Sequence, residues 1–163
     1  MIGHNDAVVV QSKTRKQFEK PRRLPNEEYR RIFSRVPRVC VDLIIKDENL
    51  GVVLVKRTIP PALGQWHLPG GGVLFGETLE EAVLRIAQNE IGIQVEVNKL
   101  AGVTDFFSDN VFGHDISLAF LVSPKSLDLR GSEQGENPAF FKTLPFPLVD
   151  EHKELLITLN YFE

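Results

Sequence analysis

A glycine-rich turn followed by a run of charged residues is the part of the sequence best equipped for chemistry. Gly70, Gly71 and Gly72 follow a proline, and glutamates recur from Glu77 to Glu90 over a stretch with helical spacing. Glycines let the backbone approach a ligand closely, and hard cations such as Mg²⁺ bind oxygen atoms. Because Mg²⁺ keeps several waters and takes one or two carboxylates plus substrate phosphates, one glutamate and one backbone carbonyl are enough for a site.

Glu90 has the most unusual position among these glutamates. It falls on the helix face that is marked by alanine, valine and isoleucine, where a carboxylate needs a partner. The residues alone leave two partners open, a metal ion and a structural arginine. Glu81 and Arg85 are four residues apart, a spacing that predicts an ion pair on the helix surface.

The elements that must position these residues follow from hydrophobic periodicity. A capping box at Thr78 and Glu81 starts a helix, and Gly92 provides its left-handed end. A second helix is predicted between Asn26 and Pro37. The predicted strands are rich in β-branched and apolar residues and cover 39–45, 52–55, 93–107, 116–122 and 139–142, with a hairpin turn at 47–51 and a closing helix over 148–161. This order predicts a mixed α/β layered domain.

Length and composition limit the organisation of the chain. Its 163 residues, 42% hydrophobic and 25% charged, fit one domain over 24–163 after a basic, flexible arm at 1–23. Ten of the 19 lysines and arginines lie between Lys13 and Arg38, but such basic stretches are usually solvated arms, so nucleic acid is not an expected partner. Cys40 is expected to be a core thiol in a reducing compartment. No apolar run reaches the roughly 18 residues of a membrane helix, so we expect a cytoplasmic protein without a membrane partner.

The glycine turn and its helix resemble the Nudix box. The residues that match the pattern G-x5-E-x7-R-E-U-x-E-E-x-G-U are Gly71, Glu77, Arg85, Ala87, Glu90, Gly92 and Ile93. Ile86 and Asn89 stand where the pattern has two further glutamates, so this helix would hold fewer metal ions than a complete box. Over about 24–142 the chain is similar to the GDP-mannose mannosyl hydrolase branch, with matches at 41–44, 56–58, 61–66, 69–71, 77–80, 90–92 and 133–134. The resemblance implies a Nudix-type α/β/α sandwich with a mixed sheet.

The resemblance also implies an activity and a metal site. Enzymes of this branch hydrolyse a nucleoside diphosphate sugar by attack of water at the anomeric carbon of the sugar, and they are homodimers. By position, one Mg²⁺, or Mn²⁺ in its place, would be held by the Gly70 carbonyl, the Glu90 carboxylate and the Gln134 side-chain oxygen. Arg57 would bind the diphosphate and stabilise the charge that develops on it.

The roles of five further residues stay more open. Asp42 would bind the sugar or a catalytic arginine, and a buried structural ion pair is the alternative. Tyr29 and Phe120 would lie near the nucleotide base, and ordinary core packing is the alternative for both rings. Trp66 is expected to pack in the core, whereas the direction of the neighbouring His67 stays open.

Two positions depart from the branch. Gly135 stands where the branch has a histidine base, and Gly72 stands where an arginine follows two glycines. Glu133, Glu136 and His114 are the candidates for the missing base. These losses keep two alternatives to the sugar hydrolase: a Nudix pyrophosphatase that cleaves the P–O–P linkage, and a nucleotide-binding module without catalysis.

Overall fold

Seven strands form one sheet whose two halves share strand β1 in this computed structural model, which describes residues 7–12, 23–108 and 113–162. The strands are β1 (Arg38–Asp47), β2 (Gly51–Arg57), β3 (Trp66–His67), β4 (Gly70–Gly72), β5 (Val95–Phe107), β6 (His114–Pro124) and β7 (Gly135–Phe141). The helices are α1 (Asn26–Phe33), α2 (Leu79–Ile86) and α3 (Asp150–Thr158), and a π-helical turn, η1 (Ala87–Ile91), continues α2.

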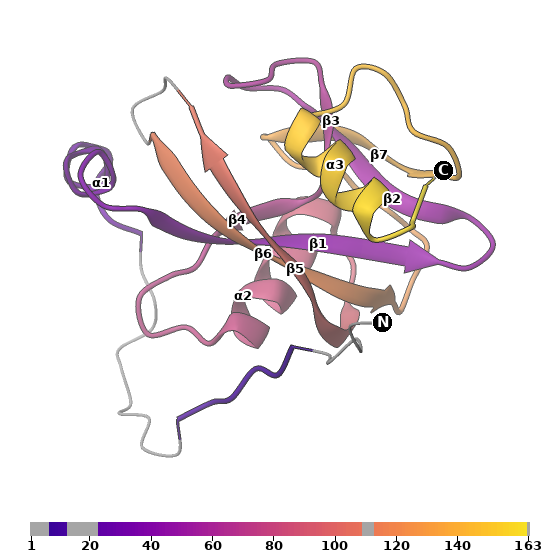
Figure 1. The fold of residues 1–163 in the computed structure, drawn as a ribbon, viewed down its shortest axis with the longest axis horizontal. Helices are drawn as coiled ribbons and strands as arrows, with labels where there is room; N and C mark the ends of the chain where they lie inside the picture. The colour runs from indigo at the N-terminus through magenta and orange to yellow at the C-terminus, as the bar shows by residue number, and fades with distance from the viewer. Residues whose placement is uncertain (1–6, 13–22, 109–112, 163) are drawn as a thin grey trace.

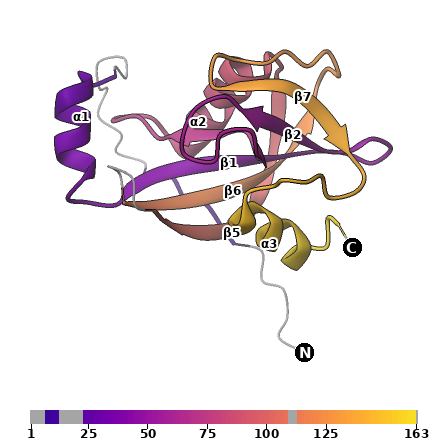
Figure 2. The same ribbon diagram turned by 90° about the horizontal axis from the view of Figure 1, so that it is seen from above.

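The sheet is mixed and lies between two helices. β1 pairs with β6 in parallel, whereas its pairings with β2 and β4 are antiparallel. Figure 1 shows β1, β6 and β5 crossing the molecule, and Figure 2 shows α2 and α3 on opposite sides of the sheet. The predicted α/β/α sandwich with a mixed sheet is therefore confirmed.

Alternation along β1 divides the core between the two faces. Val41, Leu43 and Ile45 pack in the cluster that includes the apolar side of α2, while Ile44 packs in the cluster that includes Leu156 of α3. Successive side chains of a strand point to opposite faces, so β1 is apolar on both sides where both helices cover it. Asp42 breaks this apolar run on the face of Ile44, and it is only 7% exposed.

The two halves of the sheet separate beyond the first hairpin. β1 pairs with β2 only next to the turn, at Lys46–Val52 and Asp47–Gly51. Farther along, the segment 66–72 joins them, since β3 pairs with β2 and β4 pairs with β1. The glycine turn thus lies where the sheet divides, with backbone from both halves beside it.

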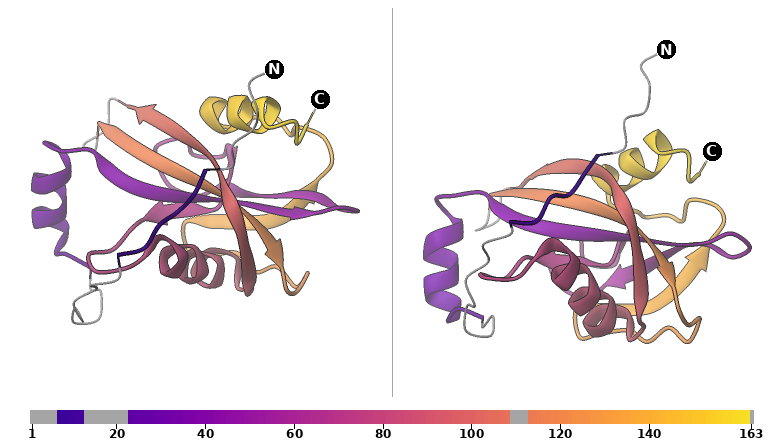
Figure 3. Two further views of the ribbon diagram at one scale, coloured as in Figure 1. Left: turned by 60° about the horizontal axis from the view of Figure 1, so that its bottom comes forward. Right: turned by 90° about the horizontal axis from the view of Figure 1, so that it is seen from below.

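The described N-terminal residues, 7–12 and helix α1, lie at the edge of the sheet. Helix α1 has no buried residue and stands beside the sheet in Figure 1. Ala7 forms a bridge with Leu100 of β5, and the segment 7–12 passes β5 on the side of α2 (Figure 3). Most of the predicted arm at 1–23 lies outside the described residues, so its flexibility stays a prediction. In the described part of the chain, no helix is both long and apolar enough to cross a membrane.

The predicted helices and strands agree with the structure, apart from the two shortest strands and one side-chain pairing. The capping box at Thr78 is present, and Gly92 ends the helix with φ 74°. β3 and β4 were not predicted, because two or three residues carry no periodic pattern. The predicted Glu81–Arg85 ion pair is wrong. Glu81 accepts the Thr78 N–H in the capping box, and Arg85 binds Glu77 instead.

Candidate active site

Arg85, in the last turn of α2, binds both the turn before the helix and the end of the glycine strand. Arg85 Nε donates to Glu77 Oε1 at 2.6 Å, and Arg85 Nη2 donates to the carbonyl of Gly72 at 2.9 Å. Glu77 also accepts the N–H of Leu74 at 3.0 Å. Burial by itself raises the pKa of Glu77, but the hydrogen bonds from Arg85 and Leu74 outweigh it and leave that pKa below its ordinary value. Glu77 and Arg85 therefore hold the turn and are structural.

The glycine strand runs along the helix in the opposite direction. Gly72 contacts Arg85, and a Cβ on Gly71 would lie 3.4 Å from Cδ1 of Ile86. These contacts order Gly72 and Gly71 along the helix from Arg85 to Ile86. Gly70 has no room for a side chain, because a Cβ there would collide with the carboxylate of Asp42.

A serine joins Glu90 to the loop that precedes β7. Ser132 Oγ donates to Glu90 Oε2 at 2.6 Å. The same oxygen lies 3.2 Å from the backbone nitrogens of Gln134 and Gly135, and it accepts from both. The partner of Glu90 is thus a neutral hydroxyl and not a structural arginine. No local pattern predicts the role of Ser132, since the bond spans 42 positions.

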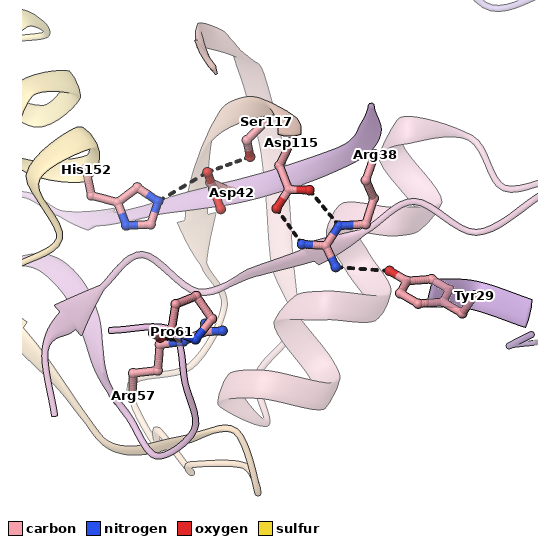
Figure 4. A network of polar contacts seen from close by, with 8 residues as sticks. All are labelled: Tyr29, Arg38, Asp42, Arg57, Pro61, Asp115, Ser117 and His152. Atoms are coloured by element: carbon pink, nitrogen blue, oxygen red, sulfur yellow. Dashed lines mark hydrogen bonds and ion pairs between the residues drawn. The ribbon is translucent and has the colours of Figure 1, made fainter. Parts of the chain in front are cut away.

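Arg57 lies next to the same loop. It ends β2 opposite Gly135 of β7, and the N–H of Thr58 donates to the Gln134 carbonyl at 3.2 Å. The Arg57 Nε donates to the carbonyl of Pro61, which folds the loop after β2 over the side chain (Figure 4). Glu90, Gln134 and Arg57, predicted from distant parts of the sequence, are therefore brought together by hydrogen bonds around one loop.

The charge around Arg57 favours an anionic ligand. Burial lowers its pKa, the positive charge of Arg38 lowers it further, and Glu90 and Asp115 act in the opposite direction. Arg38 is itself paired with Asp115, whereas the Nε of Arg57 donates to carbonyl oxygens, so Arg57 is the cation of the two that phosphate oxygens would neutralise.

Asp42 takes part in a buried network with α3. Ser117 Oγ donates to Asp42 Oδ2 at 2.5 Å, and His152 Nε2 lies 3.3 Å from the same oxygen (Figure 4). The Nδ1 of His152 accepts the N–H of Leu68 at 3.2 Å, so Nε2 carries the proton and donates to Asp42. The observed partner of Asp42 is a histidine, which agrees with a buried structural pair more than with a contact to Arg57.

The rings that were predicted to lie near a base occupy different surroundings. The Tyr29 hydroxyl accepts from Arg38 at 3.0 Å, and Arg38 also forms a two-point ion pair with Asp115, with Nε 2.9 Å from Oδ1 (Figure 4). Phe120 is 3% exposed in the core beneath α2, so it has little surface to offer a base. Trp66 packs edge-on against Phe141 at 4.7 Å, as predicted.

The candidates for the missing base are spread over two places. Glu133 and Glu136 are both exposed, on either side of the buried Gly135. His114 lies at the start of β6, where its ring stacks on Phe107 at 4.4 Å and its Nε2 is 3.6 Å from Asp105. Glu133 is thus on the loop that Ser132 ties to Glu90, Glu136 follows it as the second residue of β7, and His114 is on a different strand.

Comparison with known proteins identifies the family to which the chain belongs. Residues 36–156 match the NUDIX domain family. The chain belongs to the Nudix family. Its sequence is 42% identical over 96 residues to the low-salt glycan biosynthesis protein Agl8 of Haloferax volcanii, a match that covers 58% of this chain and 61% of that protein. It is 35% identical over 121 residues to an ADP-ribose pyrophosphatase of Methanocaldococcus jannaschii, covering 74% of this chain and 71% of the relative.

Solved structures agree with this assignment. A MutT NUDIX hydrolase from Burkholderia pseudomallei superposes with a TM-score of 0.68 at 31% identity, covering 75% of this chain and 97% of the other. The NUDIX domain of Shewanella oneidensis NrtR, solved with ADP-ribose, superposes with a TM-score of 0.61 at 21% identity, covering 77% of this chain and 87% of the other. The second likeness shows the fold alone.

Of the residues 86, 89 and 90 at the C-terminal end of the Nudix helix, only Glu90 has a carboxylate. Ile86 is buried and Asn89 is exposed, and neither side chain has a carboxylate. Among the described residues, no group of three or more His, Cys, Asp and Glu side chains is placed to hold a metal ion. The oxygen that contacts Glu90 is the neutral hydroxyl of Ser132. A set of one carboxylate with neutral oxygens fits Mg²⁺, which completes its shell with water and phosphate.

Proposed function

We propose that this Nudix protein is a Mg²⁺-dependent hydrolase of a nucleoside diphosphate sugar that releases the nucleoside diphosphate and the free sugar. The observation that carries the proposal is the hydrogen-bonded grouping of Glu90, the Gln134 loop and Arg57. It supplies an anionic metal ligand and a diphosphate-binding cation from three separate elements.

In this proposal the Gly70 carbonyl, Glu90 and the Gln134 side chain would hold Mg²⁺ or Mn²⁺. When bound, the ion would neutralise charge on the departing diphosphate. Arg57 would bind the diphosphate on its other side, where two parallel N–H groups fit phosphate oxygens. Glu90 is the one carboxylate at the C-terminal end of the helix, which supports a site for one metal ion. The sugar hydrolases that the chain resembles use one ion.

The remaining polar side chains would recognise the organic parts of the substrate and the water. The Oδ1 atom of Asp42, which lies beside Gly70, would face the sugar. Tyr29 would bound the nucleotide base at the other end of β1. Glu136 and Glu133 are the favoured proton acceptors, because Ser132 ties to Glu90 the loop that carries Glu133 and leads to Glu136, and His114 is the remaining candidate.

The reaction would consume one water. The water oxygen bonds to the anomeric carbon, the bond from that carbon to the diphosphate oxygen breaks, and the electron pair leaves with the diphosphate. The proton from the water passes to the proton acceptor, for which Glu136 and Glu133 are the favoured residues.

A second candidate is a Nudix pyrophosphatase, and the 35% identity to the ADP-ribose pyrophosphatase favours it. Hydrolysis in ¹⁸O-labelled water separates the two. A panel of GDP-, UDP-, ADP- and CDP-sugars and ADP-ribose would be incubated with Mg²⁺, and the products identified by mass. Label in the free sugar supports the sugar hydrolase, and label in a phosphate supports the pyrophosphatase. Turnover of no compound in the panel would overturn both and leave the binding module.

We also propose a homodimer that uses α1. This helix has no buried residue, although Ile32, on the predicted apolar stripe with Tyr29 and Phe33, is a large apolar side chain with 36% exposure. A second copy would cover that stripe. Light scattering should give twice the chain mass, and the Ile32→Glu variant should give a monomer. A monomeric wild type at micromolar concentration would contradict the proposal.

A further inference from the structure

A buried histidine lies between the two halves of the sheet with one ring nitrogen unused. His67 is in β3, opposite Val55 of β2, and is 9% exposed. Its Nδ1 lies 2.6 Å from the carbonyl oxygen of Leu68. A carbonyl oxygen only accepts hydrogen bonds, so Nδ1 carries the proton and Nε2 is left with a lone pair.

The Nε2 atom of His67 is an acceptor without a donor. It is buried and has no hydrogen-bond partner among the residues that the structure describes. Buried polar groups of native proteins nearly always have a partner, which is a protein group, an ordered water or a ligand. Burial, together with the nearby His152 and Arg57, lowers the pKa of His67 to about 4, so the ring is neutral at pH 7 and keeps this lone pair.

The unused nitrogen is directed at the loop that carries the candidate site. A Cβ on Gly135 would lie 3.9 Å from His67 Nε2, and 3.2 Å from Cγ2 of Val55. Gly135 follows Gln134 and pairs with Arg57. The missing side chain of Gly135 thus leaves His67 as the nearest polar side-chain atom on that side of the loop.

We propose that His67 Nε2 accepts a hydrogen bond from an O–H group that takes part in the reaction, either the attacking water or a hydroxyl of the sugar. This proposal rests on the hydrolase activity proposed above. The bond from Nδ1 to the Leu68 carbonyl fixes the ring, so the lone pair of Nε2 has a fixed direction. Nε2 is also buried, so bulk water does not compete for it. A hydrogen bond at such a place orients the donor more than one in open solvent.

Three substitutions separate this role from a structural one. His67→Phe keeps the ring shape and removes Nε2. His67→Gln places an amide oxygen at the reach of Nε2, and His67→Asn is too short to do so. We expect kcat/KM to fall roughly 10- to 100-fold in the Phe and Asn variants and to recover in part in the Gln variant. All three variants also remove the Nδ1 donor of the Leu68 carbonyl, so the same loss in melting temperature is expected in each, and only the difference in kcat/KM between the Gln and Asn variants reports on Nε2.

The source of the O–H group follows from a substrate analogue. If the sugar hydroxyl is the donor, His67→Phe and the wild type should hydrolyse a deoxy analogue that lacks that hydroxyl equally fast. If the water is the donor, the loss should be the same for the parent sugar and for every deoxy analogue and should fall on kcat. Wild-type kcat and KM in a folded His67→Phe protein would overturn the proposal.

A spectroscopic measurement tests His67 without relying on turnover. The ¹⁵N resonance of the ring nitrogens in the full chain, labelled at histidine, would be recorded with Mg²⁺ and with GDP or ADP. A shift of the unprotonated nitrogen toward the hydrogen-bonded value on nucleotide addition, absent in a His67→Gln spectrum, supports the contact. A nitrogen that stays unchanged with every nucleotide, both without and with the free sugar added, overturns it, even if the protein proves to hydrolyse another class of substrate.

Discussion

The two ends of the Nudix helix use their glutamates in different ways. At the N-terminal end, Glu77 is paired with Arg85, and Glu81 completes the capping box. At the C-terminal end, Glu90 is half-buried in a π-helical turn, and its partner is the neutral hydroxyl of Ser132. A carboxylate with a cationic partner is already neutralised, whereas one with a hydroxyl partner still attracts a cation. Within one motif, the first end therefore holds the turn, and we propose that the second binds the metal ion.

The largest expected effect is on activity, at the C-terminal end. Glu90→Gln removes the negative charge and keeps the shape, so we expect kcat/KM with Mg²⁺ to fall by about 100-fold or more, with little change in stability. Steady-state kinetics on the best substrate of the panel measure this. Glu80→Gln, an exposed glutamate of the same helix, is the matched control and should keep wild-type activity. Equal losses in both variants would remove the distinction between the ends.

The next effect is on stability, at the N-terminal end. Glu77→Gln leaves Arg85 without its carboxylate, and the Glu77 side chain is only 5% exposed. We expect a loss of about 2 kcal/mol in the free energy of unfolding. Urea denaturation followed by circular dichroism measures it. A variant as stable as the wild type, but inactive, would instead place Glu77 among the ligands.

A smaller loss should follow from removal of the helix cap. Thr78→Ala loses the hydrogen bond to the Glu81 N–H, which has a length of 3.1 Å. Such caps stabilise proteins by about 1 kcal/mol. The same denaturation experiment applies, with Thr78→Ser as the control that keeps the hydroxyl. No difference between the Ala and Ser variants would show that the capping box contributes little.

The smallest effect concerns pH. The pKa of Glu77 is lower in the folded chain than in the unfolded one, because Arg85 and Leu74 outweigh the effect of burial. The ionised group therefore contributes its full stability above the unfolded pKa, and that contribution is lost as the pH falls through the folded value. Unfolding of wild type and Glu77→Gln from pH 6 to pH 3 should show a shallower acid dependence in the variant. A steeper dependence in the variant would reverse the sign that we derive.

Local sequence patterns predicted where the Nudix helix begins and ends, but not which residue pairs with Arg85. The capping box and Gly92 are signals within a few residues, so the limits of the helix followed from the sequence. The ion pair was assigned to the wrong glutamate, because the helical spacing of four ignored the turn that folds Glu77 back over the helix. The sequence allowed Glu81 either to pair with Arg85 or to accept the Thr78 N–H, and in the structure it accepts the Thr78 N–H.

The rest of the site depends on contacts between distant segments. Ser132 meets Glu90 across 42 positions, and Arg38 meets Asp115 across 77. No periodicity records such pairs. The resemblance to Nudix proteins named Glu90, Gln134 and Arg57 in advance, but it did not give the direction of His67, which depends on the pairing of a two-residue strand.

Metal binding to three proteins tests most directly whether the C-terminal end of the helix is the ligand site. Mn²⁺ would be titrated into the wild type, Glu90→Gln and Glu80→Gln, with the bound ion counted by electron paramagnetic resonance. We predict one ion per chain in the wild type and in Glu80→Gln, and a loss of affinity of at least about 10-fold in Glu90→Gln. Unchanged affinity and one bound ion in Glu90→Gln would contradict the account.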